Sequence, residues 1–300
     1  MRTMIRAATR NTVSGRSWLT HGMGRRSRTV VSNRAARAAG GSSPRRAGLK
    51  SDSEIEVMRE AGQIVASALQ AVRMRAAIGT TLGDLDEVAE SVIRDRGAEP
   101  LFKNYHPRWS PTPFPGTICA SVNDVVVHGI PNGDALVDGD LVSIDCGARY
   151  DGWCGDAAVS FIVGRPDAAD QGLIEATERA LAEGIAAARP GNTMGDVAHA
   201  IGRSARAGGY GLLANHGGHG IGREMHESPS VPNEGPAGRG LLLQPGLVIA
   251  LEPMLIAGGD DDYTVDADGW TIRTADGSRA AHAEHTVAVT ASGPRILTLL

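Results

Sequence analysis

Cysteine and lysine are both scarce in this 300-residue chain, and long apolar runs are missing. The three cysteines, Cys119, Cys146 and Cys154, lack the number and spacing of a disulfide framework or a structural zinc site. We therefore expect a reducing, intracellular compartment. The most apolar stretch, residues 241–257, is interrupted by glutamine, proline, glycine and glutamate. It therefore lacks the roughly 18 continuous apolar residues of a membrane span, and no transmembrane helix is predicted.

Acidic residues are absent from residues 1–50, which contain 12 lysines and arginines. The rest of the chain holds 18 basic and 34 acidic residues, so a segment of charge +12 precedes a body of charge −16. Residues 1–49 also lack hydrophobic periodicity and contain a flexible Ala-Gly-Ser run. We expect a basic, disordered extension over residues 1–49 and a single folded domain over residues 50–300.

Three interpretations of the basic extension stay open. It is a bacterial tail or an over-extended translation start, an organelle transit peptide, or an arm that contacts RNA or anionic surfaces. The strong preference for arginine over lysine indicates a GC-rich genome and favours the first. The extension has no apolar core for a secretory signal, no cysteine for a zinc site and no Pro-x-x-Pro ligand.

Four amphipathic helices are predicted in two pairs. The first begins at a capping box, Ser51 to Glu54, and the others show apolar residues at three- and four-residue steps. The predicted helices cover residues 51–72, 81–97, 173–188 and 194–206. The motif Gly-x-Thr-x-Gly-Asp occurs at residues 79–84 and again at residues 191–196, a constant offset of 112 residues. This repeat indicates a duplicated α/β unit.

Strand patterns lie between and after the helix pairs, at residues 124–128, 141–146, 156–163, 247–252 and 282–289. Their side chains alternate between the two faces of a sheet. In the third pattern, Asp156, Ala158 and Ser160 share one face, while Phe161 and Val163 lie on the other. We therefore expect an α+β fold whose sheet packs its apolar face on helices and turns its small and polar face toward a cavity.

Two aspartates flank a predicted hairpin. Asp145 ends one strand and Asp156 begins the next, with the turn-rich residues 147–155 between them. The hairpin would place their Cβ atoms roughly 4.5–7 Å apart. Two ionised carboxylates that close repel unless one is protonated or a cation lies between them. The pair indicates a metal site or an acid dyad, and two solvated carboxylates at hairpin ends are the alternative.

Further polar residues accompany the aspartate pair. His219 and His226 stand in a glycine-rich segment, Glu252 ends an apolar strand and Glu284 lies inside a strand pattern. A buried acid in a strand is costly without partners. Each of these residues taken alone fits a surface or salt-bridged role, and together they are candidates for a metal or catalytic site.

Five separated motifs resemble those of type I methionine aminopeptidases, metallohydrolases with the pita-bread fold, over residues 49–299. The motifs are Cys119 to Asp124 leading into His128 to Pro131, Ile144-Asp145 with Asp156, Gly218 to Gly222 with His226-Glu227, Leu251 to Met254, and Glu284 to Thr286. The resemblance implies two α/β halves related by a pseudo-twofold axis, with a curved antiparallel sheet covered by helices. It further implies that residues 50–300 form the catalytic domain of a cytoplasmic enzyme. That enzyme would remove the initiator methionine of nascent polypeptides, favouring a small second residue.

The same resemblance assigns roles to individual residues. Two divalent metal ions would be held by five ligands: Asp145, Asp156, His219, Glu252 and Glu284. This mostly oxygen ligand set suits Mn, Fe, Co or Zn. A pair of ions about 3.5–4 Å apart lowers the pKa of a bridging water and stabilises developing charge. Glu252 would also take the water's proton, while His226 would polarise the scissile carbonyl and His128 would guide the substrate amide.

The methionine pocket implied by the resemblance is apolar, with histidines at its edge. Its expected residues are Phe114, Cys119, His128, Met225, His226 and Trp270. The chain departs from the family at two places: residues 101–116 form a longer, more proline-rich lid, and Met225 stands where an aromatic residue is usual. Cys119 is expected to line the pocket without acting as a nucleophile. His282 and His285 are expected to have surface or supporting roles.

Two other functions were weighed against this one. An Xaa-Pro aminopeptidase-like hydrolase shares the fold, but the run Ser121 to Asp124 with His128 to Pro131 favours methionine. A non-catalytic binding protein of the same fold would be expected to lose metal ligands, and all five positions are intact here. The expected partners are nascent polypeptide N-termini, with a ribosome contact through the basic segment, and neither DNA nor a membrane.

Overall fold

The computed structural model describes residues 29–31 and 48–300. In this part of the chain, no helix is both long enough and apolar enough to cross a membrane. Residues 29–31 form a short strand, β1 (Thr29–Val31), which pairs antiparallel with β12 (Tyr263–Val265). The disorder expected over residues 1–49 therefore does not extend to these three residues. Residues 1–28 and 32–47 lie outside the described part, so the expectation for them stays a prediction.

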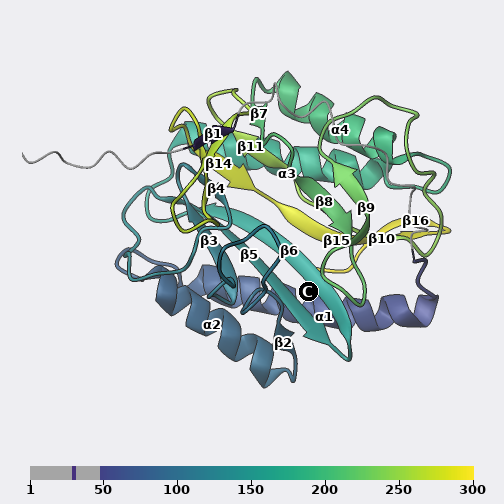
Figure 1. Ribbon diagram of the computed structural model, residues 1–300, viewed down its shortest axis with the longest axis horizontal. Helices are drawn as coiled ribbons and strands as arrows, with labels where there is room; N and C mark the ends of the chain where they lie inside the picture. Colours follow the sequence, from purple (N-terminus) through teal and green to yellow (C-terminus); the bar gives the residue numbers. More distant parts are fainter. Residues whose placement is uncertain (1–28, 32–47) are drawn as a thin grey trace, which may run out of the picture.

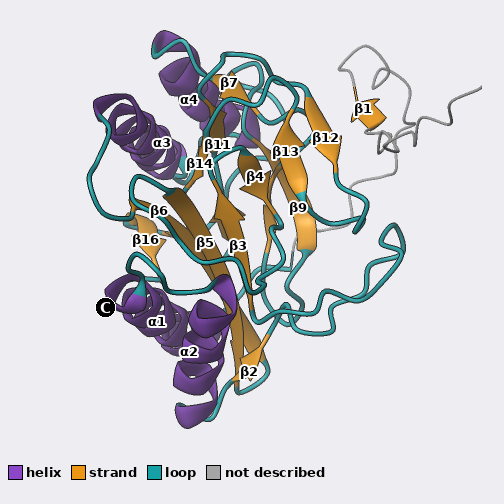
Figure 2. Cartoon of the chain, turned by 90° about the vertical axis from the view of Figure 1, so that its left-hand side faces the viewer, coloured by secondary structure: helices purple, strands orange, loops and turns teal. Residues whose placement is uncertain are grey.

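Two helix pairs form where the sequence predicts them. They are α1 (Asp52–Arg75), α2 (Leu82–Asp95), α3 (Ala168–Ala187) and α4 (Met194–Ala207). Helix α1 begins at the predicted capping box of Ser51 and Glu54. Helix α3 begins five residues earlier than the apolar pattern indicates, because Asp167 caps it by accepting a hydrogen bond from the Ala169 N–H. Figure 2 shows both pairs on the same side of the strands.

A nine-stranded antiparallel sheet runs through the molecule in the order β2-β5-β6-β15-β10-β8-β9, with β3 on β5 and β16 on β15. It curves between the two helix pairs (Figure 1). Its strands are β2 (Glu99–Pro100), β3 (Ile118–Val122), β5 (Leu141–Tyr150), β6 (Trp153–Ile162), β8 (Gly217–Gly220), β9 (Glu227–Pro232), β10 (Val248–Leu251), β15 (Glu284–Thr290) and β16 (Gly293–Ile296). This architecture confirms the α+β pita-bread expectation.

Two smaller sheets complete the fold. One has the order β1-β12-β13-β4, with β13 (Ile272–Thr274) and β4 (Val125–Val127). The other has the order β14-β11-β7, with β14 (Ala280–His282), β11 (Met254–Ile256) and β7 (Gly211–Leu212). The strand predicted over residues 282–289 is thus divided at Ala283, and its first residue belongs to a different sheet.

The two halves repeat the same local structure. Thr81 and Thr193 each cap the second helix of a pair through a capping box with an aspartate three residues on. The same two threonines make equivalent isolated bridges, to Ala135 and to Leu242. Each helix pair also has its own core: α1 and α2 pack on β5 and β6, and α3 and α4 pack on β10 and β15. The duplication indicated by the sequence motif therefore extends to the capping and packing of both halves.

The hairpin of β5 and β6 is longer than predicted. Residues 147–150 and 153–155 continue the two strands, and the turn is reduced to Asp151 and Gly152. Both turn residues have positive φ, 47° and 74°, as a two-residue hairpin turn of the type favoured by Asp-Gly requires. The extra strand residues carry the hairpin past the aspartates, so Asp145 and Asp156 lie inside the sheet and not at its end.

Candidate functional site

Four side chains stand in one row across the main sheet. Ala158 is paired with Asp145 on one side and with Glu284 on the other, and Asp145 is paired in turn with Cys119. Paired residues of antiparallel strands point to the same face. Asp156 shares this face two residues from Ala158. The small Ala158 side chain therefore leaves space between carboxylates that three different strands supply.

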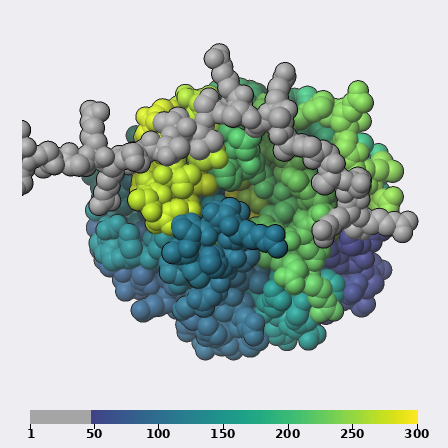
Figure 3. All heavy atoms as spheres, viewed as in Figure 1, coloured from purple at the N-terminus to yellow at the C-terminus, as the bar shows by residue number. Residues whose placement is uncertain are grey.

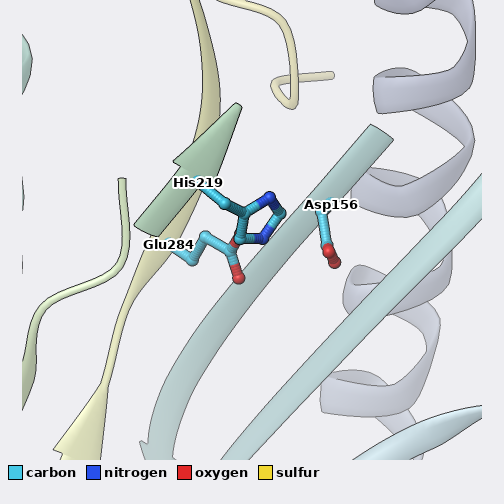
Figure 4. Close-up of side chains that lie close together, drawn as sticks. All are labelled: Asp156, His219 and Glu284. Carbon is cyan, nitrogen blue, oxygen red and sulfur yellow. The ribbon is translucent and has the colours of Figure 1, made fainter. Parts of the chain in front are cut away.

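His219 on β8 and Glu252 after β10 complete the cluster. The His219 Nε2 lies 3.5 Å from a Glu252 carboxylate oxygen. Ligand atoms of Asp156, His219 and Glu284 all lie within 4.8 Å of one another, and Figure 4 shows the three side chains converging from three strands. A second such group, with the same spacing, consists of Glu252, His282 and Glu284. We call Asp145, Asp156, Glu252 and Glu284 the floor.

Burial raises the pKa of every floor carboxylate. It raises the pKa of Asp156 to about 7, and it raises those of Asp145, Glu252 and Glu284 well above the ordinary range, with a further contribution from the charge of Asp156. Within residues 48–300, one buried oxygen each of Asp145, Asp156 and Glu284 accepts no hydrogen bond. Four clustered acids, three of them with an unsatisfied buried oxygen, are costly unless cations compensate them. The donor set therefore fits divalent cations.

Buried hydroxyl groups hold the strands that carry the floor. The Thr286 hydroxyl accepts a hydrogen bond from the Asp156 N–H and donates one to the Asp156 carbonyl, at 3.0 and 2.8 Å. Ser160 makes the same reciprocal pair with the backbone of His282, at 2.7 and 3.0 Å. These bonds fix β6 against β15 and β14 at the level of the carboxylates.

The surface role considered for His282 is wrong, because its side chain is 2% exposed. Its Nε2 lies 3.8 Å from Glu252 and 4.0 Å from Glu284, and burial lowers the pKa of the ring to about 3. The alternation of the strand pattern already placed His282 on the same face as Glu284. The sequence pattern therefore indicated that His282 faces the cluster. It did not indicate that the strand is interrupted at Ala283, where the chain passes from one sheet to another.

His226 lies on the loop between β8 and β9, at the mouth of the cleft. Its ring centroid is 4.3 Å from that of His219, and its Nδ1 is 3.1 Å from the Tyr105 hydroxyl. Burial lowers its pKa to about 4, so the ring is neutral near pH 7. An ion pair of 2.7 Å between Lys50, whose side chain is 5% exposed, and Glu227 anchors the end of the loop.

Two cavities meet at the floor. An apolar cavity of about 350 Å³ is lined by Phe114, Cys119, Met225 and Trp270, which belong to one apolar cluster. A more polar cavity of about 540 Å³ extends the other way, toward the ion pair of Arg206 and Asp261. Five residues line both: His128, Asp145, His219, His226 and Glu252. Figure 3 shows this face of the molecule hollowed beside the blue segment that follows residue 100.

His128 and Cys119 both line the apolar cavity. His128 has φ of 59°, and burial lowers the pKa of its ring to about 3. Burial and the neighbouring Asp145 raise the pKa of the Cys119 thiol well above its ordinary value. A protonated thiol is a poor nucleophile, which agrees with a lining role for this cysteine.

Three residues at the cleft were not among the expected site residues. Tyr105 contacts His226, Trp109 lies 4.9 Å from Trp270 between ring centroids, and His216 lines the polar cavity beside His128. Tyr105 and Trp109 belong to the proline-rich lid of residues 101–116. Only the path of that lid over the cleft identifies them.

Comparison with known proteins places this site in a family. The model of metallopeptidase family M24 matches residues 56–291. A methionine aminopeptidase 1 of Mycobacterium tuberculosis is 55% identical over 257 residues, covering 83% of this chain and 94% of the relative. The chain belongs to the type I methionine aminopeptidases. Membership of a metallopeptidase family implies the use of divalent metal.

Solved structures agree with this family. A methionine aminopeptidase of Thermotoga maritima matches with a TM-score of 0.81 and 40% identity, covering 85% of this chain and all of that one. A prolidase of Pyrococcus furiosus matches with a TM-score of 0.67 and 23% identity, covering 84% of this chain and 65% of that one. The prolidase likeness concerns the fold alone, so the Xaa-Pro alternative has less support.

Proposed function

We propose that this aminopeptidase hydrolyses the bond after the N-terminal methionine of nascent polypeptides and favours a small second residue. The observation that carries the proposal is the position of the carboxylate floor at the junction of two cavities. The apolar cavity on one side suits the first side chain, and the larger, more polar cavity on the other side suits the rest of a peptide. The scissile bond then lies over the floor.

We propose that Asp145, Asp156, His219, Glu252 and Glu284 hold two divalent ions, drawn from Mn, Fe, Co or Zn. The buried, unpartnered oxygens of the floor support this assignment. The ions would supply Lewis-acid polarisation and a water of lowered pKa. His282, whose Nε2 points at two floor glutamates, makes a supporting contact.

Three side chains of the cleft have roles in proton transfer and substrate positioning. Glu252 takes a proton from the attacking water, because its carboxylate lines both cavities at the place where the scissile bond would lie. The Tyr105 hydroxyl can donate to Nδ1 of His226, which leaves the proton on Nε2 for donation to the scissile carbonyl oxygen. His128, neutral because of burial, accepts a hydrogen bond from the substrate amide.

The apolar cavity supports a preference for an unbranched side chain. Met225 and Cys119 give it two polarisable sulfur atoms beside the rings of Phe114 and Trp270. One methylene-sized change in such a pocket alters the free energy of the transition state by about 1–3 kcal/mol. Norleucine should therefore be a fair substitute for methionine, and leucine, branched at Cγ, should be poor.

We propose a cytoplasmic site of action, where nascent N-termini are available after any formyl group has been removed. A ribosome contact is one of the three interpretations of the basic extension, and the charge of +12 on residues 1–50 beside −16 on the rest of the chain supports it. Binding of this kind would weaken steeply with salt, whereas hydrolysis of short peptides would not.

Turnover of the metal-reconstituted enzyme on Met-Ala-Ser, Leu-Ala-Ser and Ala-Pro-Ser tests the assignment. We expect hydrolysis of Met-Ala-Ser with each effective metal and little hydrolysis of the other two peptides. Equal turnover of Leu-Ala-Ser would contradict methionine specificity and leave aminopeptidase chemistry standing. Preference for Ala-Pro-Ser would instead favour the Xaa-Pro function. Full activity in protein that elemental analysis shows to be metal-free would contradict the metal assignment.

A further inference from the structure

The lid is a closed and internally supported loop. Within residues 101–116, the segment 104–114 forms this loop, and from here on the name lid refers to that segment. Its ends are joined by two backbone hydrogen bonds. The Asn104 N–H donates to the Phe114 carbonyl at 2.8 Å, and the Phe114 N–H donates to the Tyr105 carbonyl at 2.9 Å. Inside the loop, the Ser110 hydroxyl donates to the Thr112 carbonyl at 2.6 Å. The lid therefore has a defined shape of its own.

A second segment fixes the lid over the cleft. The Trp270 indole N–H donates to the Thr112 carbonyl at 3.0 Å. Gly269 has φ of 78° and lies so close to Pro111 that a Cβ atom would come within 2.5 Å of its ring. Trp270 itself is 4% exposed and lines the apolar cavity. The lid is thus attached to a wall of the pocket and not only to its own base.

Trp109 stands at the tip of this lid with an exposed indole. The residue is 62% exposed, although tryptophan is usually well buried. The ring meets Trp270 edge-on at 4.9 Å and lies at 26° to His128, with centroids 6.4 Å apart. An aromatic side chain held over a cleft by a fixed loop, and still open to solvent, has a free face for a ligand.

The residues around Trp109 indicate which part of a bound peptide would contact its exposed face. The first side chain fills the space among Phe114, Cys119, Met225 and Trp270, all nearly buried. Trp109 is at the open end of the same cavity, beside His128, which also lines the polar cavity. The indole therefore stands where the peptide passes from its first residue to its second, on the side where His128 meets the substrate amide.

We propose that Trp109 determines how large the second residue of the substrate can be. This inference rests on the proposed function, because it assumes that the first residue occupies the apolar cavity. The indole narrows the passage beside His128, so Gly, Ala, Ser or Val passes and longer side chains collide with the ring. Trp109 is then a specificity-determining residue supplied by the long lid of this chain.

The test is kcat/KM for a peptide series Met-X-Ser, with X as Gly, Ala, Val, Leu or Met, in wild type, Trp109→Leu and Trp109→Ala. We expect the ratio of Met-Leu-Ser to Met-Ala-Ser to rise by about tenfold or more in Trp109→Ala and by less in Trp109→Leu. Arg108→Ala, an exposed neighbour that lines neither cavity, is the matched control and should leave the ratio unchanged.

Two results would overturn the proposal. One is an unchanged Leu to Ala ratio in folded Trp109→Ala and Trp109→Leu. The other is a change in selectivity for the first residue, measured with Y-Ala-Ser peptides, without a change at the second. If wild type cleaves after a first residue other than methionine, the methionine assignment fails by itself. The second-residue series is then run with that other residue, so the two failures are distinguishable.

Discussion

The floor and the lid line the same cleft, but they differ in burial and in hydrogen bonding. Three floor carboxylates, those of Asp145, Asp156 and Glu284, are held inside the sheet by strand pairing, and each has one buried oxygen without a hydrogen-bond partner among the described residues. Lid side chains are held by a loop whose polar groups bond to each other, and its tryptophan is exposed. The floor therefore gathers acids whose charge suits cations, whereas the polar groups of the lid are paired within the loop and with Trp270.

This difference has consequences for substitutions. A change in the floor should alter metal binding and the stability of the metal-free protein, because buried charges are removed. A change in the lid should alter the selection of peptides and leave the metal and the stability nearly unaffected. Each prediction below checks one part of this contrast.

The largest effect is expected in the floor. Asp145→Asn or Glu284→Gln removes one charge from the proposed ligand set, so metal content, measured by elemental analysis, should fall together with peptide turnover. Activity should drop by about 10²-fold or more. Trp109→Leu is the matched lid change, and it should keep the full metal content. A floor variant with normal metal content and normal turnover would contradict the assignment.

His226→Ala should separate catalysis from metal binding. His226 lies at the mouth, bonded to the Tyr105 hydroxyl of the lid and outside the five proposed ligands. We expect kcat to fall by about 10²-fold while metal content and KM change little, because the lost interaction belongs to the transition state. Tyr105→Phe, which removes only the hydroxyl, should cause a smaller loss. Loss of metal from His226→Ala would instead show that His226 contributes to metal binding.

The stability of the metal-free protein should depend on pH through Asp156. Its pKa is about 7 in the folded chain, against an ordinary value near 3.8. Between these values the unfolded chain releases the proton and the folded chain retains it, so the free energy of unfolding falls as pH rises. Asp156→Asn removes this loss and should be stabilising relative to wild type above pH 7, by up to roughly 4 kcal/mol, because each pKa unit corresponds to about 1.4 kcal/mol.

Urea unfolding of both proteins at pH 5 and pH 8 in chelator measures this difference. The advantage of Asp156→Asn should be larger at pH 8 and should disappear when metal is added to wild type. The lowered histidine pKa values act in the opposite direction below pH 6.5, and they are common to both proteins. An advantage that does not grow with pH would contradict the raised pKa.

The smallest effect is expected for deletion of residues 1–48. This deletion removes β1 but retains Lys50, whose ion pair with Glu227 anchors the loop of His226. Turnover of Met-Ala-Ser should stay within a few-fold of wild type. As a comparison, Lys50→Met in the full chain should reduce kcat more than the deletion does. A collapse of kcat/KM on deletion would show that the extension supports the cleft.

Much of the scaffold was predictable because its causes are local. Capping boxes, apolar spacing and the repeated Gly-x-Thr-x-Gly-Asp motif are read along a single segment, and they correctly predicted both helix pairs. Alternation correctly placed Asp156 and Ser160 on the face opposite to Phe161. The start of α3 was missed because Asp167 caps it before the apolar pattern begins.

The sequence by itself determined the family, the two helix pairs and the candidate residues of the floor, because each depends on residue type and spacing. The curvature of the sheet was expected only from the resemblance to the family. Tertiary structure alone decided which residues meet. It placed Ala158 between Asp145 and Glu284, turned His282 toward the floor and set Trp109 over the cleft beside His128. The physical reason is that strand register and the path of a long loop depend on packing between segments far apart in the chain, which no local pattern encodes.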